Sequence, residues 1–155
     1  MNKSQMKTPA DIEKMRQAGL ILNGAHQMVS TLIKPGTTTR QIDNIVDQFI
    51  SDAGAIPLFK GVRGVVPFPA ATCTSVNEEV VHGIPGNRVL EEGDIISIDI
   101  GVKLNGWCAD AATTYAVGNI SREKQDLLRV TEETLSLAIR QIGRASCRER
   151  VCHRV

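Results

Sequence analysis

The feature that most constrains this chain is a run of alternating residues followed by a two-residue turn signal. Isoleucine or valine occupies every second position from 96 to 102, with small or polar residues between them. Such alternation is typical of a strand with one apolar and one polar face. Asn105-Gly106, the strongest short hairpin signal, comes next, and Trp107 to Val117 is the expected return strand. The sequence therefore predicts a β-hairpin between Asp94 and Val117.

The turn also predicts which residues face each other. With Asn105-Gly106 as the turn, Gly101 faces Asp110. Asp99 then shares a face with Asp110 as a diagonal neighbour, roughly 7–8 Å away at the backbone. Two carboxylates among apolar residues repel each other, and a shared proton or a bound cation relieves the repulsion. Manganese, iron or cobalt would suit such a pair. The alternative, in which one aspartate caps a turn or faces solvent, is equally open on spacing alone.

A first helix is expected near the start of the chain. Thr8 is a suitable N-cap, Pro9 suits the first helical position, and Asp11 is favourable in the first turn. Lys34-Pro35-Gly36 ends the helix. Apolar residues recur between these signals at a helical spacing, at Ile12, Met15, Leu22, Val29 and Leu32.

A second helix begins at once, because Thr38 and Gln41 have the spacing of a capping box. It is expected to end near Gly54. Prolines and glycines between Ala55 and Ala71 indicate a loop on the surface, and 71–76 is predicted to be a short strand. The apolar stripe of the second helix consists of Ile42, Ile45, Val46, Phe49 and Ile50.

Ser121 opens a third amphipathic helix. The predicted order is two helices, three strands and one helix, and it contains a hairpin. This order favours an α+β fold over a doubly wound parallel sheet. The 155 residues correspond to about one domain. The apolar residues of the third helix are Leu127, Leu128, Leu135, Ala138 and Ile139.

Composition excludes several classes of protein. The formal net charge is +1, so the chain lacks the basic excess of a nucleic-acid-binding protein. No apolar run is long enough to span a membrane, and the polar start does not resemble a secretory signal. We therefore expect a cytoplasmic protein with reduced thiols. The cysteines are Cys73, Cys108, Cys147 and Cys152, and no two of them form a CxxC pair.

His82 is a further candidate for the site. The apolar pair Val80-Val81 precedes it, and Gly83 to Gly86 predicts a turn after a short strand. A histidine on such a loop can reach into a cleft and donate a hydrogen bond or carry a proton. An ordinary surface residue is the alternative. His26 lies within the first helix and is expected to be structural.

Three runs of residues resemble the type I methionine aminopeptidases. They are Ser75 to Pro85, Glu92 to Gly101 and Asn105 to Thr114, and the opening helices are similar as well. The resemblance extends from about Thr8 to Gln141. It implies the N-terminal half of the pita-bread fold, in which two pseudo-symmetric halves clasp a dinuclear metal site.

The resemblance implies a role for each of five residues. Asp99 would bind one metal ion and Asp110 would bridge both, and the two ions would be divalent cobalt, manganese or iron. His82 would be the catalytic residue that contacts the substrate near the scissile amide. Phe68 and Cys73 would line the methionine pocket, although ordinary core packing is the alternative for both.

The activity implied is metal-dependent removal of the N-terminal methionine from nascent proteins, with a small second residue preferred. Nascent polypeptide N-termini would be the partners, with docking at the ribosome as a further expectation. A monomer is expected for the complete protein, with neither membrane nor direct nucleic-acid binding. A proline-specific pita-bread peptidase and a non-catalytic pita-bread binding protein are the alternatives. Retention of both Asp99 and Asp110 argues against the second of these.

The sequence departs from the family in two places. The family site has five protein ligands, and its remaining histidine and two glutamates come from a second half for which this chain has no candidates after Gln141. Residues 1–141 are therefore interpreted as the N-terminal part of the catalytic domain. Residues 142–155 form a basic tail that resembles translated sequencing adapter, and we expect it to have no biological role. The loop Val62–Pro69 also fits the family pattern poorly.

Overall fold

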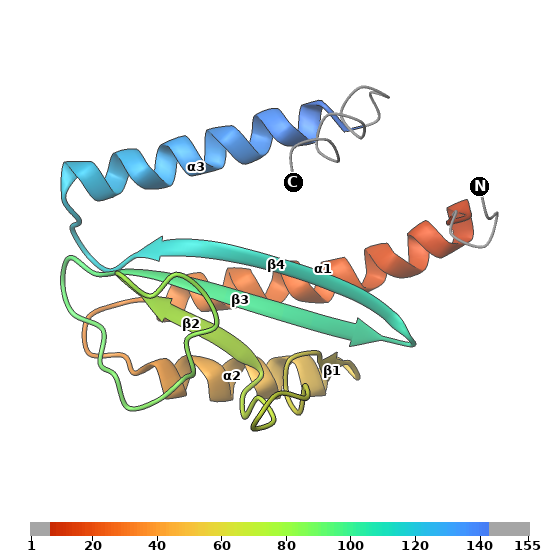
Figure 1. Ribbon diagram of the computed structural model, residues 1–155. Helices are drawn as coiled ribbons and strands as arrows, with labels where there is room; N and C mark the ends of the chain where they lie inside the picture. Colours follow the sequence, from red (N-terminus) through yellow and green to blue (C-terminus); the bar gives the residue numbers. More distant parts are fainter. Residues whose placement is uncertain (1–6, 143–155) are drawn as a thin grey trace. The chain divides into compact units, whose positions relative to one another are not determined.

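The computed structural model describes residues 7–142. They divide into two units, one ending at Ile120 and the other beginning at Ser121. The first unit contains two helices and four strands, and the second contains α3 (Arg122–Arg140) (Figure 1). The tail predicted at 142–155 lies, apart from Ile142, outside the described residues.

Both helices of the first unit begin with a capping box, which the sequence analysis predicted for Thr38 and Gln41, whereas at the first helix it predicted only the N-cap Thr8. In α1 (Pro9–Leu32), the backbone N–H of Asp11 donates to Thr8 Oγ1 at 3.2 Å, and the Thr8 N–H donates to Asp11 Oδ2 at 3.0 Å. In α2 (Thr39–Asp52), Thr38 and Gln41 exchange equivalent bonds of 3.2 and 2.9 Å. These bonds satisfy backbone donors that a helix start would otherwise leave unpaired.

The four strands form one antiparallel sheet centred on β3 (Ile95–Leu104). β4 (Trp107–Ala116) pairs with β3 along its whole length. β2 (Thr72–Val76) and β1 (Ile56–Pro57) therefore share the other edge of β3. The expectation of a loop throughout Ala55–Ala71 was wrong at β1. A strand of two residues, one of them a proline, gives no alternation from which it could be predicted.

The predicted hairpin is confirmed. Asn105 and Gly106 have φ angles of 50° and 86°, the left-handed backbone that a two-residue type I′ turn requires. Leu104 faces Trp107, and the register then continues without interruption to Ile95. β4 ends at Ala116, one residue earlier than predicted.

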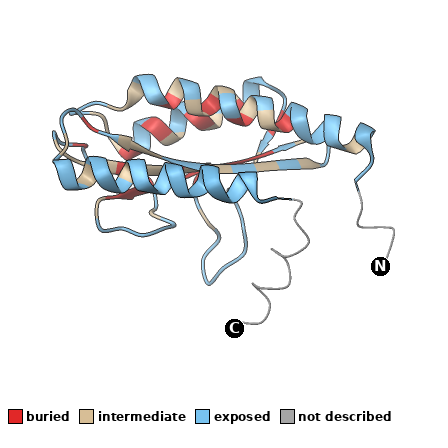
Figure 2. Ribbon diagram, turned by 90° about the horizontal axis from the view of Figure 1, so that it is seen from above, coloured by how far each residue is buried: buried red, intermediate tan, exposed pale blue. Residues whose placement is uncertain are grey.

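One face of the sheet carries the core. α1 and α2 both cover this face, as the buried stretches of the two helices in Figure 2 show. Ile96, Ile98 and Ile100 are fully buried there, whereas Ile12 and Met15 of α1 stay 49% and 39% exposed. Burial on α1 begins only at Ala18, so the helical pattern at its start does not mark core residues. The helix residues of the core are Leu22, Ala25, Val29, Ile42, Val46 and Ile50.

The second unit confirms the third predicted helix. The backbone N–H of Lys124 donates to Oγ of the N-cap Ser121 at 3.3 Å. None of the α3 residues is buried, and Leu135 is 60% exposed. No described helix combines the length and apolar character that crossing a bilayer requires.

The turn makes a stability prediction. At Gly106 an added Cβ would meet no atom within 4 Å, so Gly106→Ala adds only the strain of a left-handed alanine. We expect it to lower the free energy of unfolding by about 1–2 kcal/mol, measured by urea denaturation. Gly19→Ala, an equally unobstructed change inside α1, should instead raise that free energy by about 0.5–1 kcal/mol. Equal effects of the two substitutions would show that the turn conformation carries no cost.

Candidate active site

The face of the sheet opposite the helices carries the candidate carboxylates. Asp99 of β3 faces Cys73 on β2 and Ala112 on β4, so these three residues share one face. Gly101 faces Asp110, which puts Asp110 on this face as the diagonal neighbour of Asp99. The pairing that the sequence predicted for the two aspartates is therefore present. Asp110 is exposed, whereas Asp99 is half-buried.

Asp99 is electrostatically strained. Its Oδ1 atom is inaccessible to solvent and has no hydrogen-bond partner in the described part of the chain. Burial raises the pKa of the Asp99 carboxyl and Asp110 raises it further, while His82 and His26 act in the opposite direction. A buried carboxylate oxygen without a partner costs free energy that a proton or a cation can remove. Of the alternative in which one aspartate caps a turn or faces solvent, the first part does not apply to Asp99, which lies inside β3, whereas Asp110 is exposed to solvent.

The carboxylate pair fits the beginning of a metal site. Carboxylate oxygens are suitable ligands for divalent first-row metals, and Asp99 has an oxygen that is not otherwise used. Within residues 7–142, however, no group of three or more histidine, cysteine, aspartate or glutamate side chains lies close enough to hold a metal ion. Among these residues, Asp99 and Asp110 could therefore supply only part of a ligand set.

Cys73 lies on the same face in a free, protonated form. Its side chain is only 5% exposed and forms no disulfide. Burial and the nearby charge of Asp99 raise the pKa of the Cys73 thiol to about 11. The thiol is therefore neutral near pH 7 and presents a small, weakly polar surface beside Asp99.

Asp43 of α2 fixes the start of β2 from the helix side. Its Oδ1 atom accepts hydrogen bonds from the backbone N–H groups of Ala71 and Thr72 at 3.0 and 2.8 Å, and from Thr72 Oγ1 at 2.9 Å. The residue next along the chain is Cys73. Sequence reasoning missed this role, and the available signal was a carboxylate adjacent to the buried Ile42 in an apolar stripe.

His26 ties α1 to β4 next to Asp110. The His26 Nε2 atom lies 3.0 Å from the carbonyl oxygen of Ala111, and Nδ1 lies 3.0 Å from Tyr115 Oη. Because a carbonyl can only accept, Nε2 carries a proton, and the Tyr115 hydroxyl donates to the backbone carbonyl of His26 at 3.1 Å. His26 therefore has the structural role that its position in the helix predicts. Its Ala111 contact holds the backbone immediately after Asp110.

His82 lies in a loop that runs along the edge of β2. The Thr74 N–H donates to the Gly83 carbonyl at 2.8 Å, and the Gly83 N–H donates to Ser75 Oγ at 3.2 Å. His82 itself is exposed and has a left-handed φ of 59°. Such a backbone is costly for a non-glycine residue and persists only where the surroundings impose it. The prediction of a strand at Val80-Val81 was wrong, since both side chains project into solvent and no strand forms there.

The start of α2 holds the other end of this loop. The Arg40 N–H donates to the Gly86 carbonyl at 2.9 Å, and the Thr39 N–H donates to the Arg88 carbonyl at 3.1 Å. Thr39 Oγ1 also accepts from the Gly86 N–H at 2.8 Å. The His82 loop is thus fixed to β2 on one side and to α2 on the other.

Phe68 lies in the loop between β1 and β2 and is half-buried. Its backbone accepts from the Gly61 N–H at 2.8 Å and donates to the Val62 carbonyl at 3.0 Å. The tip of this loop is apolar and solvent-exposed, with Val65 fully accessible. Phe68 is therefore not part of a strand but of the segment that leads into β2.

The sequence matches metallopeptidase family M24 over residues 13–149. The chain belongs to this family. Methionine aminopeptidase 1 of Bacillus subtilis is 55% identical over 129 residues, which cover 83% of this chain and 51% of that protein. The methionine aminopeptidase of Clostridium perfringens is 48% identical over 129 residues, with the same two coverages. This M24 chain thus spans about half the length of the curated relatives that it matches.

Solved structures agree with the family assignment. The crystal structure of methionine aminopeptidase from Thermotoga maritima superposes with a TM-score of 0.84 at 42% identity, covering 89% of this chain and 55% of that one. The prolidase from Pyrococcus furiosus superposes with a TM-score of 0.70 at 21% identity, covering 83% and 36%, a likeness of fold alone. The fold is the N-terminal half of the pita-bread fold, which confirms the sequence-based prediction.

The His82 loop gives a prediction about Gly83. A Cβ at this position would lie 2.1 Å from the Thr74 carbonyl oxygen, a backbone atom that cannot move aside. We expect Gly83→Ala to break the loop from β2 and to speed amide hydrogen exchange of Thr74 by roughly tenfold or more. Gly86→Ala in the same loop, whose Cβ would be 3.9 Å from its nearest neighbour, should leave that exchange rate unchanged.

The raised pKa of Asp99 predicts a pH dependence of stability. The folded chain holds the Asp99 proton more tightly than the unfolded chain does, so the free energy of unfolding falls as pH rises from about 3.9 through the raised pKa. Asp99→Asn removes this contribution. Its urea midpoint should therefore exceed that of the unmodified chain at pH 7 and approach it at pH 3.5. A constant difference across this range would contradict the assignment.

Proposed function

We propose that this chain supplies the first half of a methionine aminopeptidase, which hydrolyses the bond after an N-terminal methionine. The observation that carries the proposal is the pair Asp99 and Asp110 on one polar sheet face, with an Asp99 oxygen that has no hydrogen-bond partner among residues 7–142. The identity of up to 55% to named methionine aminopeptidases supports the choice of reaction within the family.

Asp99 and Asp110 are the proposed metal ligands. Asp99 would bind one divalent ion, and the exposed Asp110 would bridge two, which would be cobalt, manganese or iron. A bound metal supplies Lewis acidity that polarises the scissile carbonyl and makes water a stronger nucleophile. The antiparallel β3–β4 pairing holds the two carboxylates at a fixed spacing, so the ligands are organised before any ion binds.

His82 is the proposed catalytic residue on the substrate side. Its loop is anchored through Gly83 and Gly86, so the exposed imidazole projects from a rigid support. From there it would donate a hydrogen bond to the substrate near the scissile amide. His82 also lowers the pKa of the Asp99 carboxyl, against the effect of burial.

Cys73 and Phe68 are the proposed residues of the methionine pocket. A neutral thiol beside the metal ligands gives an apolar surface that suits a thioether side chain. The half-buried ring of Phe68, in the loop before β2, would close the other side. The methionine side chain would thus contact Cys73 and Phe68, while the carboxylates of Asp99 and Asp110 would act on the substrate's amino terminus and scissile bond.

The proposed substrates are the N-termini of nascent polypeptides that have a small second residue. A cytoplasmic location, action near the ribosome and a monomeric complete protein belong to this proposal. A proline-specific peptidase is the second candidate within the family. The proline-specific neighbours share the fold at 25% identity or less, so sequence similarity favours the methionine-specific reaction.

The test is to join residues 1–141 to the C-terminal half of the Bacillus subtilis relative and assay the product. We expect methionine release from a Met-Ala-Ser peptide in the presence of manganese or cobalt. Chelation with EDTA should abolish release, and either metal should restore it, because the reaction needs a bound cation. Release that persists in EDTA, or preferential cleavage of an Xaa-Pro dipeptide, would overturn the proposal.

Substitution of the ligands sharpens this test. Loss of a residue that only hydrogen-bonds to a metal ligand typically lowers activity roughly 10- to 100-fold. Because Asp99 and Asp110 are themselves the proposed ligands, Asp99→Asn and Asp110→Asn should each lower kcat/KM by more than this. Asp52→Asn is the matched control, because Asp52 lies exposed at the end of α2 and accepts a hydrogen bond from Gln48. It should leave kcat/KM unchanged.

A further inference from the structure

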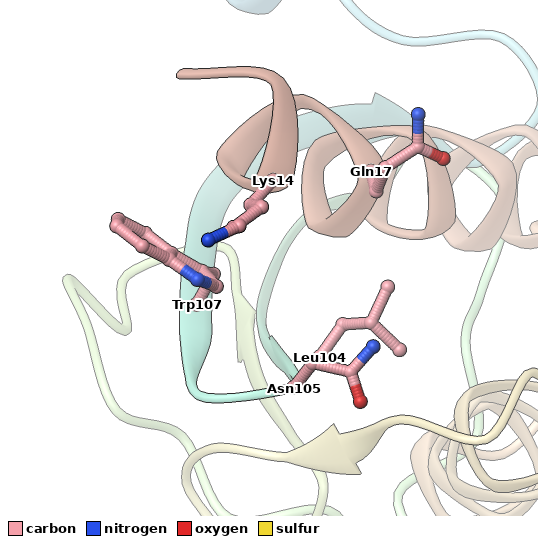
Figure 3. Close-up of a pocket in the computed structure, with 5 residues that line it drawn as sticks. All are labelled: Lys14, Gln17, Leu104, Asn105 and Trp107. Atoms are coloured by element: carbon pink, nitrogen blue, oxygen red, sulfur yellow. The ribbon is translucent and has the colours of Figure 1, made fainter. Parts of the chain in front are cut away.

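A separate pocket lies at the tip of the β3–β4 hairpin. Its volume is about 270 Å³, and Figure 3 shows the side chains that line it. α1 forms one wall and the ends of β3 and β4 form the other. The lining residues are Lys14, Gln17, Leu104, Asn105 and Trp107.

This pocket is on the other side of the sheet from the carboxylates. Leu104 is two positions beyond the buried Val102, and its partner is Trp107, so both side chains are on the helix-covered face. Asp99 and Asp110 are on the opposite face. A molecule in the hairpin-tip pocket would therefore not contact the candidate active site.

The lining combines an apolar floor with one cation. Leu104 and Trp107 are the apolar residues of the lining, and the only charged lining group is the Lys14 ammonium. Gln17 already donates its amide to Glu13 at 2.8 Å, and Glu13 is paired with Arg16 at 3.2 Å. Apolar walls with few convergent polar groups are typical of small-molecule sites.

Positive charge is concentrated at the Trp107 ring. The ammonium groups of Lys14 and Lys7 lie 5.6 and 5.7 Å from the ring centroid, within the range of cation–π attraction. The nearest acid, Asp11, has its Oδ1 atom 4.0 Å from Lys14, while its Oδ2 atom is bonded to Thr8. Two ammonium groups thus lie near one carboxylate, which the capping box with Thr8 already engages. An anion would balance this excess.

The geometry points to a binding site for a small molecule that joins a short apolar body to an anionic group such as a carboxylate. The body would pack on Leu104 and Trp107, and the anion would pair with the ammonium of Lys14. The Asn105 amide, on the tight turn, would donate a further hydrogen bond. This site is additional to the proposed peptidase site and does not depend on it.

Trp107 is the sole tryptophan of the chain, so its signals report on this pocket alone. Hexanoate is the probe, titrated into the 155-residue chain at constant ionic strength. We expect a saturable shift of the single indole N–H resonance, with a dissociation constant on the order of millimolar. Acetate, which lacks the apolar body, and hexan-1-ol, which lacks the charge, should each produce a weaker response.

Lysine variants test the role of charge. Lys14→Met keeps an apolar chain over the ring and should weaken hexanoate binding about threefold to fivefold, as for one partly exposed ion pair. Lys34→Met removes the same charge just beyond the far end of α1 and should leave binding unchanged. Lys14→Glu should abolish hexanoate binding and favour hexylammonium instead.

Two outcomes would overturn the inference. The first is a linear, non-saturating indole shift with hexanoate, which would mean that Lys7 and Lys14 only clamp the hairpin tip to α1. The second is equal weakening by Lys14→Met and Lys34→Met, which would show that overall charge rather than the pocket governs the response. Circular dichroism of each variant separates either result from loss of the fold.

Discussion

The pairing of β3 with β4 is the constraint on which the rest of the structure depends. The left-handed turn at Asn105 and Gly106 fixes the register, and the register decides which side chains share a face. A slip of one residue would exchange the apolar and polar faces of a strand. It would turn Ile98 and Ile100 out of the core and bury Asp99 against the helices. The same pairing thus creates the hydrophobic core and the carboxylate pair.

The helices add polar contacts that position the strands next to the site. Asp43 reaches from α2 to the start of β2, and His26 reaches from α1 to the β4 backbone after Asp110. Both contacts come from the covered side of the sheet, although the residues that they position face the other side. The positions of the site residues are therefore fixed by side chains on the helix-covered face, which would not contact a substrate.

Local signals in the sequence predicted much of this arrangement. Capping residues gave the helix starts, and alternation together with Asn105-Gly106 gave the hairpin and the shared face of the aspartates. Contacts between residues distant in sequence could not be predicted in this way. The three hydrogen bonds of Asp43 and the pairing of β1 produce no periodic pattern in the sequence. Val80-Val81 has a strand-like composition but no partner strand. The outcome at these positions is set by packing rather than by propensity.

The setting of Cys73 also determines how the chain responds to electrophiles. Of the two thiols among the described residues, Cys73 is buried and Cys108 is exposed. Only a thiolate reacts readily, and the raised pKa of Cys73 leaves very little of it ionised near neutral pH. A reagent that alkylates cysteine will therefore modify Cys108 on β4 well before Cys73. Covalent compounds aimed at the proposed methionine pocket would encounter Cys73, the less reactive of these two thiols. Ligands that bind reversibly are therefore better suited to that pocket.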